Sequence, residues 1–231
     1  MNADAPTSLP AIVEGVLFDL DGTLLDSAPD LYAALLVQCA DENRSPPPYA
    51  PVRAVVSRGA RSVLRCAFGA GDEPAIDALL PRYLQIYQRV MGEQTTSFDG
   101  IDDLLKRIEA RGMCWGIVTN KAAVLTDELL LRIGWGGRAR AVVCGDTLPV
   151  KKPDPAPVLL ACERAGIAPS RTVFVGDDRR DIQAGAAAGL YTVAVGWGYL
   201  DGGDPRAWGA DAVVDHPVQL ANLLRLQAVS V

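Results

Sequence analysis

Two aspartates separated by one residue follow an apolar run near the start of the chain. The Val-Leu-Phe run at 16–18 leads to Asp19 and Asp21, and Gly22 and Thr23 come directly after them. In an extended segment, side chains two residues apart point to the same side, so both carboxylates are expected to face one site. Carboxylates that remain ionised at the end of a buried strand need a cation or hydrogen-bond donors. The pattern therefore predicts a charged site, although the pair alone would also suit a plain polar turn.

Three further polar motifs occur later in the chain, each beside an apolar run or a turn. They are Thr119-Asn120-Lys121, Lys151-Lys152-Pro153-Asp154-Pro155 and Gly176-Asp177-Asp178-Arg179-Arg180-Asp181. With the first motif, and in this order, they resemble the motif set of the haloacid dehalogenase superfamily of phosphotransferases. The resemblance extends from about Val13 to Pro217. It implies an enzyme that transfers phosphoryl groups with the help of Mg²⁺.

The first motif supplies the candidate catalytic carboxylates. A carboxylate at the carboxyl end of a central strand can attack phosphorus, so Asp19 is the candidate nucleophile for an aspartyl-phosphate. Asp21 is the candidate general acid and base, which protonates the leaving alcohol and then activates water. The resemblance implies that the backbone carbonyl of Asp21 also binds Mg²⁺. Dehalogenases of the superfamily lack this second aspartate, so its presence favours phosphoryl transfer.

The last motif supplies the candidate metal carboxylate, Asp177. Mg²⁺ takes oxygen ligands and usually only one or two protein carboxylates, which Asp19 and Asp177 would provide. The resemblance implies that Asp181 orients a metal-bound water or the lysine of the third motif. The alternative is that Asp177 and Asp178 only cap a helix, where negative charge is favourable. The arginine pair at 179–180 is expected to remain in solvent.

The second and third motifs are expected to hold the phosphate. Thr119, with the backbone amides of Asn120 and Lys121, predicts a phosphate cradle at a strand-to-helix turn, the alternative being a simple threonine cap. Lys152 precedes a proline that keeps it extended, so its ammonium can be directed at the nucleophile and the phosphoryl group. A solvated turn made of Lys151 and Lys152 is the alternative.

The elements that must position these motifs alternate between strand and helix. Strands are expected at 12–20, 114–119, 141–144, 172–176, 192–195 and 212–214, and helices at 101–110, 124–133, 156–165 and 182–188. Several of the strand segments are apolar on both faces, as strands buried in a parallel sheet are. The alternation predicts a doubly wound, Rossmann-like α/β sheet, the core fold of the superfamily.

One segment interrupts this alternation and predicts an inserted all-helical cap. Between about 29 and 98 no strand pattern occurs, and helical patterns cover 31–40, 52–68 and 74–91. Hinges are expected near 26–29 and 97–100. The position matches the type-one cap of the superfamily. We therefore expect an α/β catalytic core made of 1–27 and 99–231 and a cap domain made of 28–98, which we call the cap segment.

The cap segment should select the substrate, because the core motifs address only phosphate and metal. It concentrates four arginines between 53 and 65 in an otherwise acidic chain. Arg58, Arg61 and Arg65 have helical spacing and are expected to share one face. Ser57, Arg58 and Arg61 are candidate substrate-binding residues, because arginine binds a carboxylate through two parallel hydrogen bonds. Asn120, in the phosphate cradle, is a further candidate. A solvated cationic helix face is an equal alternative.

The composition of the chain limits the classes of molecule that it is expected to bind. The net charge of −6 and the pI near 4.8 argue against nucleic acid, which needs a basic footprint. No apolar run approaches the ~18 residues of a membrane span, and the first ten residues, expected to form a loose tail, lack a signal-peptide pattern. Five scattered cysteines predict a reducing cytoplasm. A monomer or homodimer that acts on a small phosphorylated metabolite is expected.

The function expected from these features is Mg²⁺-dependent hydrolysis of a phosphomonoester. The overall motif pattern resembles the phosphoglycolate phosphatase branch most, while the tracts 55–61 and 205–211 resemble N-acetylmuramic acid 6-phosphate phosphatases of cell-wall recycling. A sugar-phosphate mutase is a third alternative. A two-component receiver domain also combines an aspartate, an acidic pair, a threonine and a lysine, but its acidic pair comes first and it lacks the insertion. A non-catalytic binding protein of the same fold has no feature in its favour.

Overall fold

A six-stranded parallel sheet forms the centre of the molecule. The computed structural model describes residues 8–69, 71 and 73–227, so the predicted tail lies outside it over residues 1–7. The sheet has the order β5-β4-β1-β6-β7-β8, and every neighbouring pair is parallel. Its strands are β1 (Gly15–Phe18), β4 (Cys114–Val118), β5 (Ala141–Val143), β6 (Thr172–Gly176), β7 (Tyr191–Val195) and β8 (Ala212–Val214). This topology confirms the predicted α/β fold, although the first strand is shorter than the predicted 12–20.

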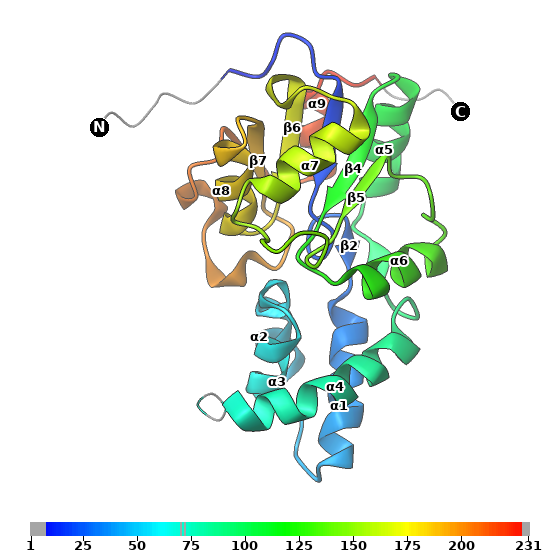
Figure 1. Cartoon of the computed structure of the whole chain (residues 1–231), viewed down its shortest axis with the longest axis vertical. Helices are drawn as coiled ribbons and strands as arrows, with labels where there is room; N and C mark the ends of the chain where they lie inside the picture. Colours follow the sequence, from blue (N-terminus) through cyan, green and yellow to red (C-terminus); the bar gives the residue numbers. More distant parts are fainter. Residues whose placement is uncertain (1–7, 70, 72, 228–231) are drawn as a thin grey trace.

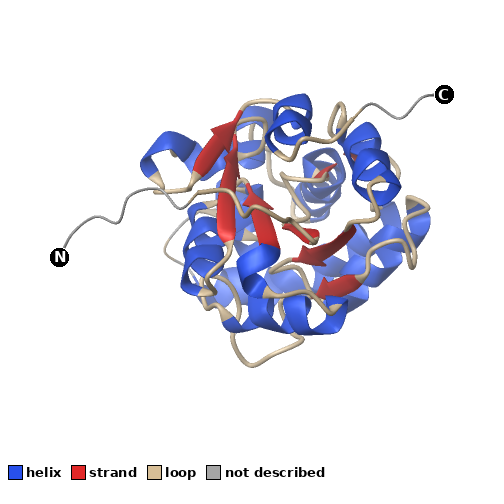
Figure 2. Cartoon of the chain, turned by 90° about the horizontal axis from the view of Figure 1, so that it is seen from above, coloured by secondary structure: helices blue, strands red, loops and turns tan. Residues whose placement is uncertain are grey.

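Helices cover both faces of this sheet, as Figure 2 shows from above. Val16 and Phe18 of β1 share a buried cluster with α5 (Ile101–Ala110) and α9 (Pro217–Leu223). Leu17, between them, belongs to the cluster of α7 (Ala156–Ala165) and α8 (Arg179–Ala187) on the other face. This division follows from the alternation of side chains along a strand. The helix α6 (Ala123–Arg132) follows β4, and α9 was missed in the sequence.

The cap segment contributes four helices that lie beyond the sheet, next to the strand ends that carry the motifs (Figure 1). They are α1 (Ala28–Asp41), α2 (Tyr49–Ala54), α3 (Ala60–Phe68) and α4 (Glu73–Val90), with a 3₁₀ turn, η1 (Val56–Arg58), before α3. The predicted single helix over 52–68 is therefore wrong. Gly59 interrupts it, because its φ of +86° and ψ of 177° are not helical.

The cap segment is joined to the core by a short two-stranded ribbon. Its strands β2 (Leu25–Asp26) and β3 (Thr96–Ser97) are antiparallel, and β3 contradicts the expectation that no strand occurs between 29 and 98. The buried carboxylate of Asp30 accepts hydrogen bonds from the amides of Gly92, Gln94 and Thr95 and from the Thr95 hydroxyl. These bonds fix the chain as it leaves the cap segment. No helix among the described residues is both long and apolar enough to cross a bilayer.

Candidate active site

The motif residues meet at the carboxyl edge of the sheet. Asp19 follows β1, Thr119 follows β4 and Asp177 follows β6, and β1 pairs with both other strands. The Asp19 amide donates to the Val175 carbonyl at 2.9 Å, and the Thr119 amide to that of Val143 at 2.9 Å. Parallel strands deliver their carboxyl ends to one edge, which is where open α/β sheets bind ligands.

Three buried carboxylates form a cluster at this edge. Asp19, Asp177 and Asp181 each offer a carboxylate oxygen, and these oxygens lie within 4.8 Å of one another. Burial raises the pKa of Asp19 and of Asp181, the latter to about 7, although nearby Lys152 opposes both shifts. Burial and the neighbouring carboxylates raise the pKa of Asp177 well above its usual range. Three carboxyl groups beside one ammonium are therefore costly to ionise together, and a divalent cation would stabilise their ionised form.

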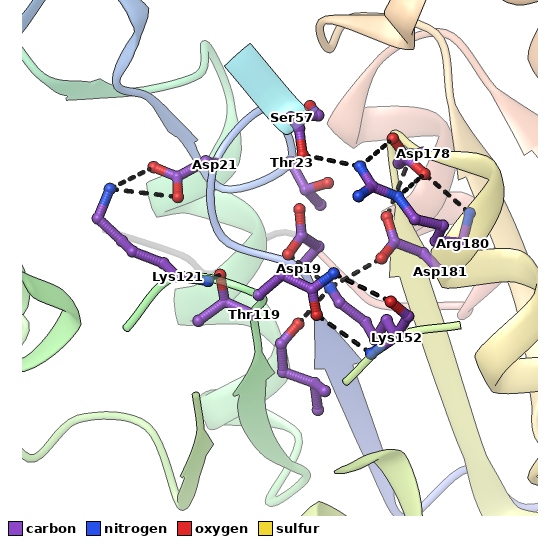
Figure 3. A network of polar contacts seen from close by, with 12 residues as sticks. Asp19, Asp21, Thr23, Ser57, Thr119, Lys121, Lys152, Asp178, Arg180 and Asp181 are labelled. Carbon is purple, nitrogen blue, oxygen red and sulfur yellow. Dashed lines mark hydrogen bonds and ion pairs between the residues drawn. The ribbon is translucent and has the colours of Figure 1, made fainter. Parts of the chain in front are cut away.

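Lys152 pairs with two of these three carboxylates, Asp19 and Asp181 (Figure 3). Its Nζ donates to Asp19 Oδ1 at 2.6 Å and to the Val118 carbonyl at 2.6 Å, and it pairs with Asp181 Oδ1 at 2.7 Å. Burial alone would lower the pKa of Lys152, but the two carboxylates raise it above its ordinary value. The alternative of a solvated lysine turn is therefore wrong for Lys152, while Lys151 is exposed.

Asn120 holds the backbone that carries this lysine. Its Oδ1 accepts from the Lys152 amide and its Nδ2 donates to the Lys152 carbonyl, both at 3.1 Å. The peptide bond that follows, between Lys152 and Pro153, is cis. The Asn120 side chain thus fixes Lys152, while the predicted contact of the Asn120 backbone amide with substrate phosphate stays a prediction. Asn120 also lines the cavity above the site.

Asp21 lines the same cavity, but its carboxylate is held by other groups. Lys121 Nζ donates to its two oxygens at 3.1 and 3.3 Å, and Ser27 Oγ donates at 2.5 Å. Lys121 also donates to the hydroxyl of Tyr87 on α4, at 2.8 Å. Burial would lower the pKa of Lys121, yet Asp21 and Tyr87 raise it above its ordinary value. The Lys121 amide, predicted to face phosphate, donates to Thr119 Oγ1 at 3.1 Å.

Asp177 is fixed by groups from distant parts of the chain. Thr23 Oγ1 donates to its Oδ1 at 3.1 Å, and the Tyr199 amide donates to its Oδ2 at 2.8 Å. The backbone of Gly22 passes so close that a Cβ there would lie 2.2 Å from Asp177 Oδ2. Gly22 also has a φ of +95°, so only glycine suits this position. Asp177 is not the helix cap that the alternative proposed, since Asp178 caps α8.

A cavity of about 420 Å³ lies between this edge and the cap segment. Ser57, Arg58, Arg61 and Arg65 all line it. The expectation that the three arginines share one helical face is wrong, because Arg58 belongs to η1 and the other two to α3. Arg61 Nε pairs with Asp77 at 2.8 Å, and Arg65 pairs with Glu73 through two nitrogens.

Arg180 contradicts the expectation that it remains in solvent. Its Nε and Nη2 donate to the two carboxylate oxygens of Asp178, at 2.8 and 2.7 Å. Its Nη2 also donates to the Ser57 carbonyl of the cap segment at 2.7 Å (Figure 3). Burial would raise the pKa of Asp178, but the bonds from Arg180 lower it. Arg179 is exposed, as predicted.

Comparison with known proteins identifies the family. Residues 16–195 match the family model described as haloacid dehalogenase-like hydrolase. The chain belongs to this family. The match includes all four motifs and the cap segment, and it confirms the resemblance seen in the sequence.

Relatives of this haloacid dehalogenase-like hydrolase are named as phosphatases. The chain is 46% identical over 206 residues to a phosphoglycolate phosphatase of Xanthomonas campestris, covering 89% of this chain and 93% of the relative. It is 44% identical over 214 residues to an N-acetylmuramic acid 6-phosphate phosphatase of Pseudomonas aeruginosa, covering 92% and 95%. The predicted enzyme class, a phosphoric monoester hydrolase, is thereby confirmed.

A solved structure shares the whole fold. The crystal structure of a predicted phosphoglycolate phosphatase from Haemophilus somnus superposes with a TM-score of 0.80. It covers 92% of this chain and 98% of its own, at 24% sequence identity. At this identity the likeness supports the fold of this haloacid dehalogenase-like hydrolase and not its substrate.

Several contacts of this haloacid dehalogenase-like hydrolase were missed in the sequence. Tyr87 and Tyr199 belong to no motif, and Lys121 was considered only for its backbone amide, yet the side chain of Lys121 contacts Asp21, Tyr87 contacts Lys121, and Tyr199 contacts Asp177. The Tyr199 hydroxyl accepts from the amides of Ser27 and Ala28, at 2.8 and 2.9 Å, where the chain enters the cap segment. Tyr199 lies 172 and 171 positions from Ser27 and Ala28 in the chain. No local sequence pattern could therefore have indicated these contacts.

Proposed function

We propose that the chain is a Mg²⁺-dependent phosphomonoesterase that works through an aspartyl-phosphate on Asp19. The observation that carries the proposal is the buried cluster of Asp19, Asp177 and Asp181, two of which pair with Lys152, at the floor of a cavity. Such a cluster is costly to bury in its ionised form unless a cation completes it. The phosphatase class of the relatives agrees with this chemistry.

The donor set of the cluster fits Mg²⁺. Carboxylate oxygens are hard ligands, and Asp19 and Asp177 supply the one or two carboxylates that Mg²⁺ usually takes from a protein. The main-chain carbonyl of Asp21 is the third proposed protein ligand. Asp181 lies in the same cluster, and we propose that it does not bind the metal directly but orients Lys152 through their ion pair. Bound Mg²⁺ would neutralise charge on the transferring phosphoryl group.

The chain's own residues have complementary roles in the proposed reaction. Asp19 forms a bond to phosphorus while the bond from phosphorus to the substrate oxygen breaks. Lys152 and the Thr119 hydroxyl hold phosphoryl oxygens, and Lys152 also orients Asp19 through its bond to Oδ1. Asp21 gives a proton to the leaving oxygen and then takes one from the attacking water. Lys121 binds both oxygens of Asp21 and so fixes the orientation of this carboxylate.

The cavity favours the larger of the two substrates suggested by the relatives. Its volume of about 420 Å³ lies within the range of pockets for drug-sized ligands and exceeds what the few atoms of phosphoglycolate require. Apolar residues line part of it, namely Val56, Leu80, Leu84 and Leu125. N-acetylmuramic acid 6-phosphate has an acetyl group, a sugar ring and a lactyl carboxylate, which suit these residues and the arginines. Phosphoglycolate, expected first from the sequence, is the second candidate, and a sugar-phosphate mutase the third.

In either case the substrate carboxylate is proposed to lie near η1. Ser57, Arg58 and Arg61 line the cavity on that side, and arginine binds a carboxylate through two parallel hydrogen bonds. We propose that residues 28–98 act as a cap domain over a core of 1–27 and 99–231. The expected cytoplasmic location, the absence of nucleic-acid and membrane partners, and the choice between monomer and homodimer stay predictions.

The test ranks kcat/KM for phosphoglycolate, N-acetylmuramic acid 6-phosphate, hexose phosphates and p-nitrophenyl phosphate, with and without Mg²⁺. We expect Mg²⁺-dependent phosphate release with N-acetylmuramic acid 6-phosphate first. Beryllofluoride with Mg²⁺ should protect the protein thermally, and Asp19→Asn should remove that protection. Release of phosphate at full rate in a chelator, or isomerised sugar phosphate without release, would contradict the proposal.

A further inference from the structure

The face of the cavity nearest η1 has a polar connection between the core and the cap segment. Ser57 is the cap residue involved: its carbonyl accepts from Arg180 Nη2 at 2.7 Å, and its hydroxyl lies 3.4 Å from Asp177 Oδ2. Asp177 lies between β6 and α8, and Arg180 lies in the first turn of α8, which also carries Asp181 of the carboxylate cluster. Ser57 of the η1 turn therefore contacts residues 177–181, which we call the metal-proximal segment because Asp177 is the proposed metal ligand.

Arg180 is suited to hold this connection because its guanidinium is oriented before it reaches the cap segment. Two of its nitrogens bind the two oxygens of Asp178, and Asp178 is itself fixed as the N-cap of α8. A planar guanidinium held at two points has little freedom left, so its third bond, to Ser57, costs little additional entropy. The Arg180 side chain also lines the cavity, directly beside the proposed substrate position.

Arg53 makes a second contact between the same side of the cap segment and the core. Arg53 of α2 donates to the Gly198 carbonyl at 3.4 Å and lies over the Tyr199 ring, 4.8 Å from its centroid. Tyr199 in turn donates its amide to Asp177. The contact of Arg53 is long and partly exposed, whereas that of Arg180 is short and charge-assisted, so Arg180 should contribute more.

We propose that Arg180 is a positioning residue that holds the Ser57 turn against the metal-proximal segment and so sets how tightly the cavity closes on substrate. It acts on substrate through the turn and takes no part in bond making or breaking. The inference deepens the proposed function and relies on it for the kinetic readout only. Arg179, its exposed neighbour with the same side chain, supplies a matched control.

The test measures amide hydrogen exchange and kinetics in Arg180→Ala, Arg180→Lys and Arg179→Ala. The amides of Arg58 and Gly59 donate to the carbonyls of Val55 and Val56, so their exchange reports on the turn. Loss of a charge-assisted bond should raise their exchange in Arg180→Ala on the order of tenfold, and raise KM similarly while kcat changes less. Arg180→Lys keeps the charge beside Asp178 but lacks the planar fork that binds both Asp178 and Ser57, so it should restore only a small part of the protection.

Several outcomes would overturn the proposal. Unchanged exchange at 58–59 in Arg180→Ala would mean that Arg180 serves Asp178 alone. Faster exchange throughout α1–α4, or the same effect in Arg179→Ala, would indicate general destabilisation. A fall confined to kcat would place Arg180 in the chemical step. If the wild-type protein hydrolysed no phosphomonoester, the proposed function would fail, while the exchange comparison would still decide the role of Arg180.

Discussion

Charged side chains on the two sides of the cavity are held in different ways. Lys152 and Asp181, below it, are paired at 2.7 Å with side chains only 3% and 2% exposed. Arg61 and Asp77, in the cap segment, are paired at a similar 2.8 Å with side chains 53% and 56% exposed. Removing one partner of a buried pair costs about 3–5 kcal/mol, whereas an exposed pair contributes about 0–1 kcal/mol. Similar distances thus correspond to a fixed chemical centre in one region and to exchangeable partners in the other.

The largest effect is expected from the core carboxylate that would form the phosphoenzyme. Asp19→Asn should reduce turnover to less than about a hundredth of wild type, because an amide cannot form the acyl phosphate. Phosphate release in steady state and a thermal melt give the measurement and its control, since the substitution is nearly isosteric and should leave the fold intact. Turnover above about a hundredth of wild type would exclude Asp19 as the nucleophile.

The second prediction compares how much a buried ion pair of the core and an exposed ion pair of the cap segment contribute to stability. Lys152→Met should lower the free energy of unfolding by about 3–5 kcal/mol, because it leaves buried carboxylates without their cation. Arg65→Met, which removes the exposed pair with Glu73, should leave it nearly unchanged. Urea unfolding of both variants without divalent metal measures the difference. Equal losses in the two variants would remove the distinction between the two regions.

The third prediction concerns the Mg²⁺ concentration that the core carboxylate Asp177 allows for activity. Asp177→Asn should raise the Mg²⁺ concentration for half-maximal activity by about tenfold or more, since even outer partners of a metal contribute on the order of tenfold. Asp178→Asn serves as a control, because Asp178 caps α8 and binds Arg180 instead of facing the cluster. Titration of activity with Mg²⁺ decides the matter, and an unmoved midpoint in Asp177→Asn would exclude it as a ligand.

The smallest effect is expected in the cap segment and only for some substrates. Arg58→Ala and Arg61→Ala should each lower kcat/KM for a carboxylate-bearing substrate on the order of tenfold to a hundredfold, the value of a charge-assisted hydrogen bond. Hydrolysis of p-nitrophenyl phosphate, which lacks a carboxylate, should change little. Equal losses on both substrates would assign the arginines to cap structure, and no loss on either would favour the solvated-face alternative.

The fold could be predicted closely because its signals are local. The helices α5 and α7 begin and end where the pattern predicts, and β6 and β8 do so as well. The core motif residues could be placed together for a related reason: parallel strands bring their carboxyl ends to one edge, whatever lies between them in the chain. The strand pattern placed Asp19, Thr119 and Asp177 each at the end of a strand, and the family resemblance predicted that they meet, although the strand order came only from the structure.

The remaining contacts could not be predicted because they depend on how distant surfaces meet. The bond between Arg180 and Ser57 joins residues 123 positions apart, and the pair of Lys121 with Asp21 joins residues 100 apart. Neither has a spacing that a helix or strand would produce. The break at Gly59 was missed for a different reason, since helical periodicity continues across it and only the backbone dihedral angles reveal the turn.

The ribbon of β2 and β3 has a consequence for how this chain can change over time. Leu25 is paired with Ser97 and Asp26 with Thr96, so the chain leaves the core and returns to it at adjacent positions. A residue gained or lost between these two strands shifts nothing in the register of the six-stranded sheet. Length and composition within that interval can therefore vary, or a different insert can replace it, while the hydrolytic centre is inherited unchanged.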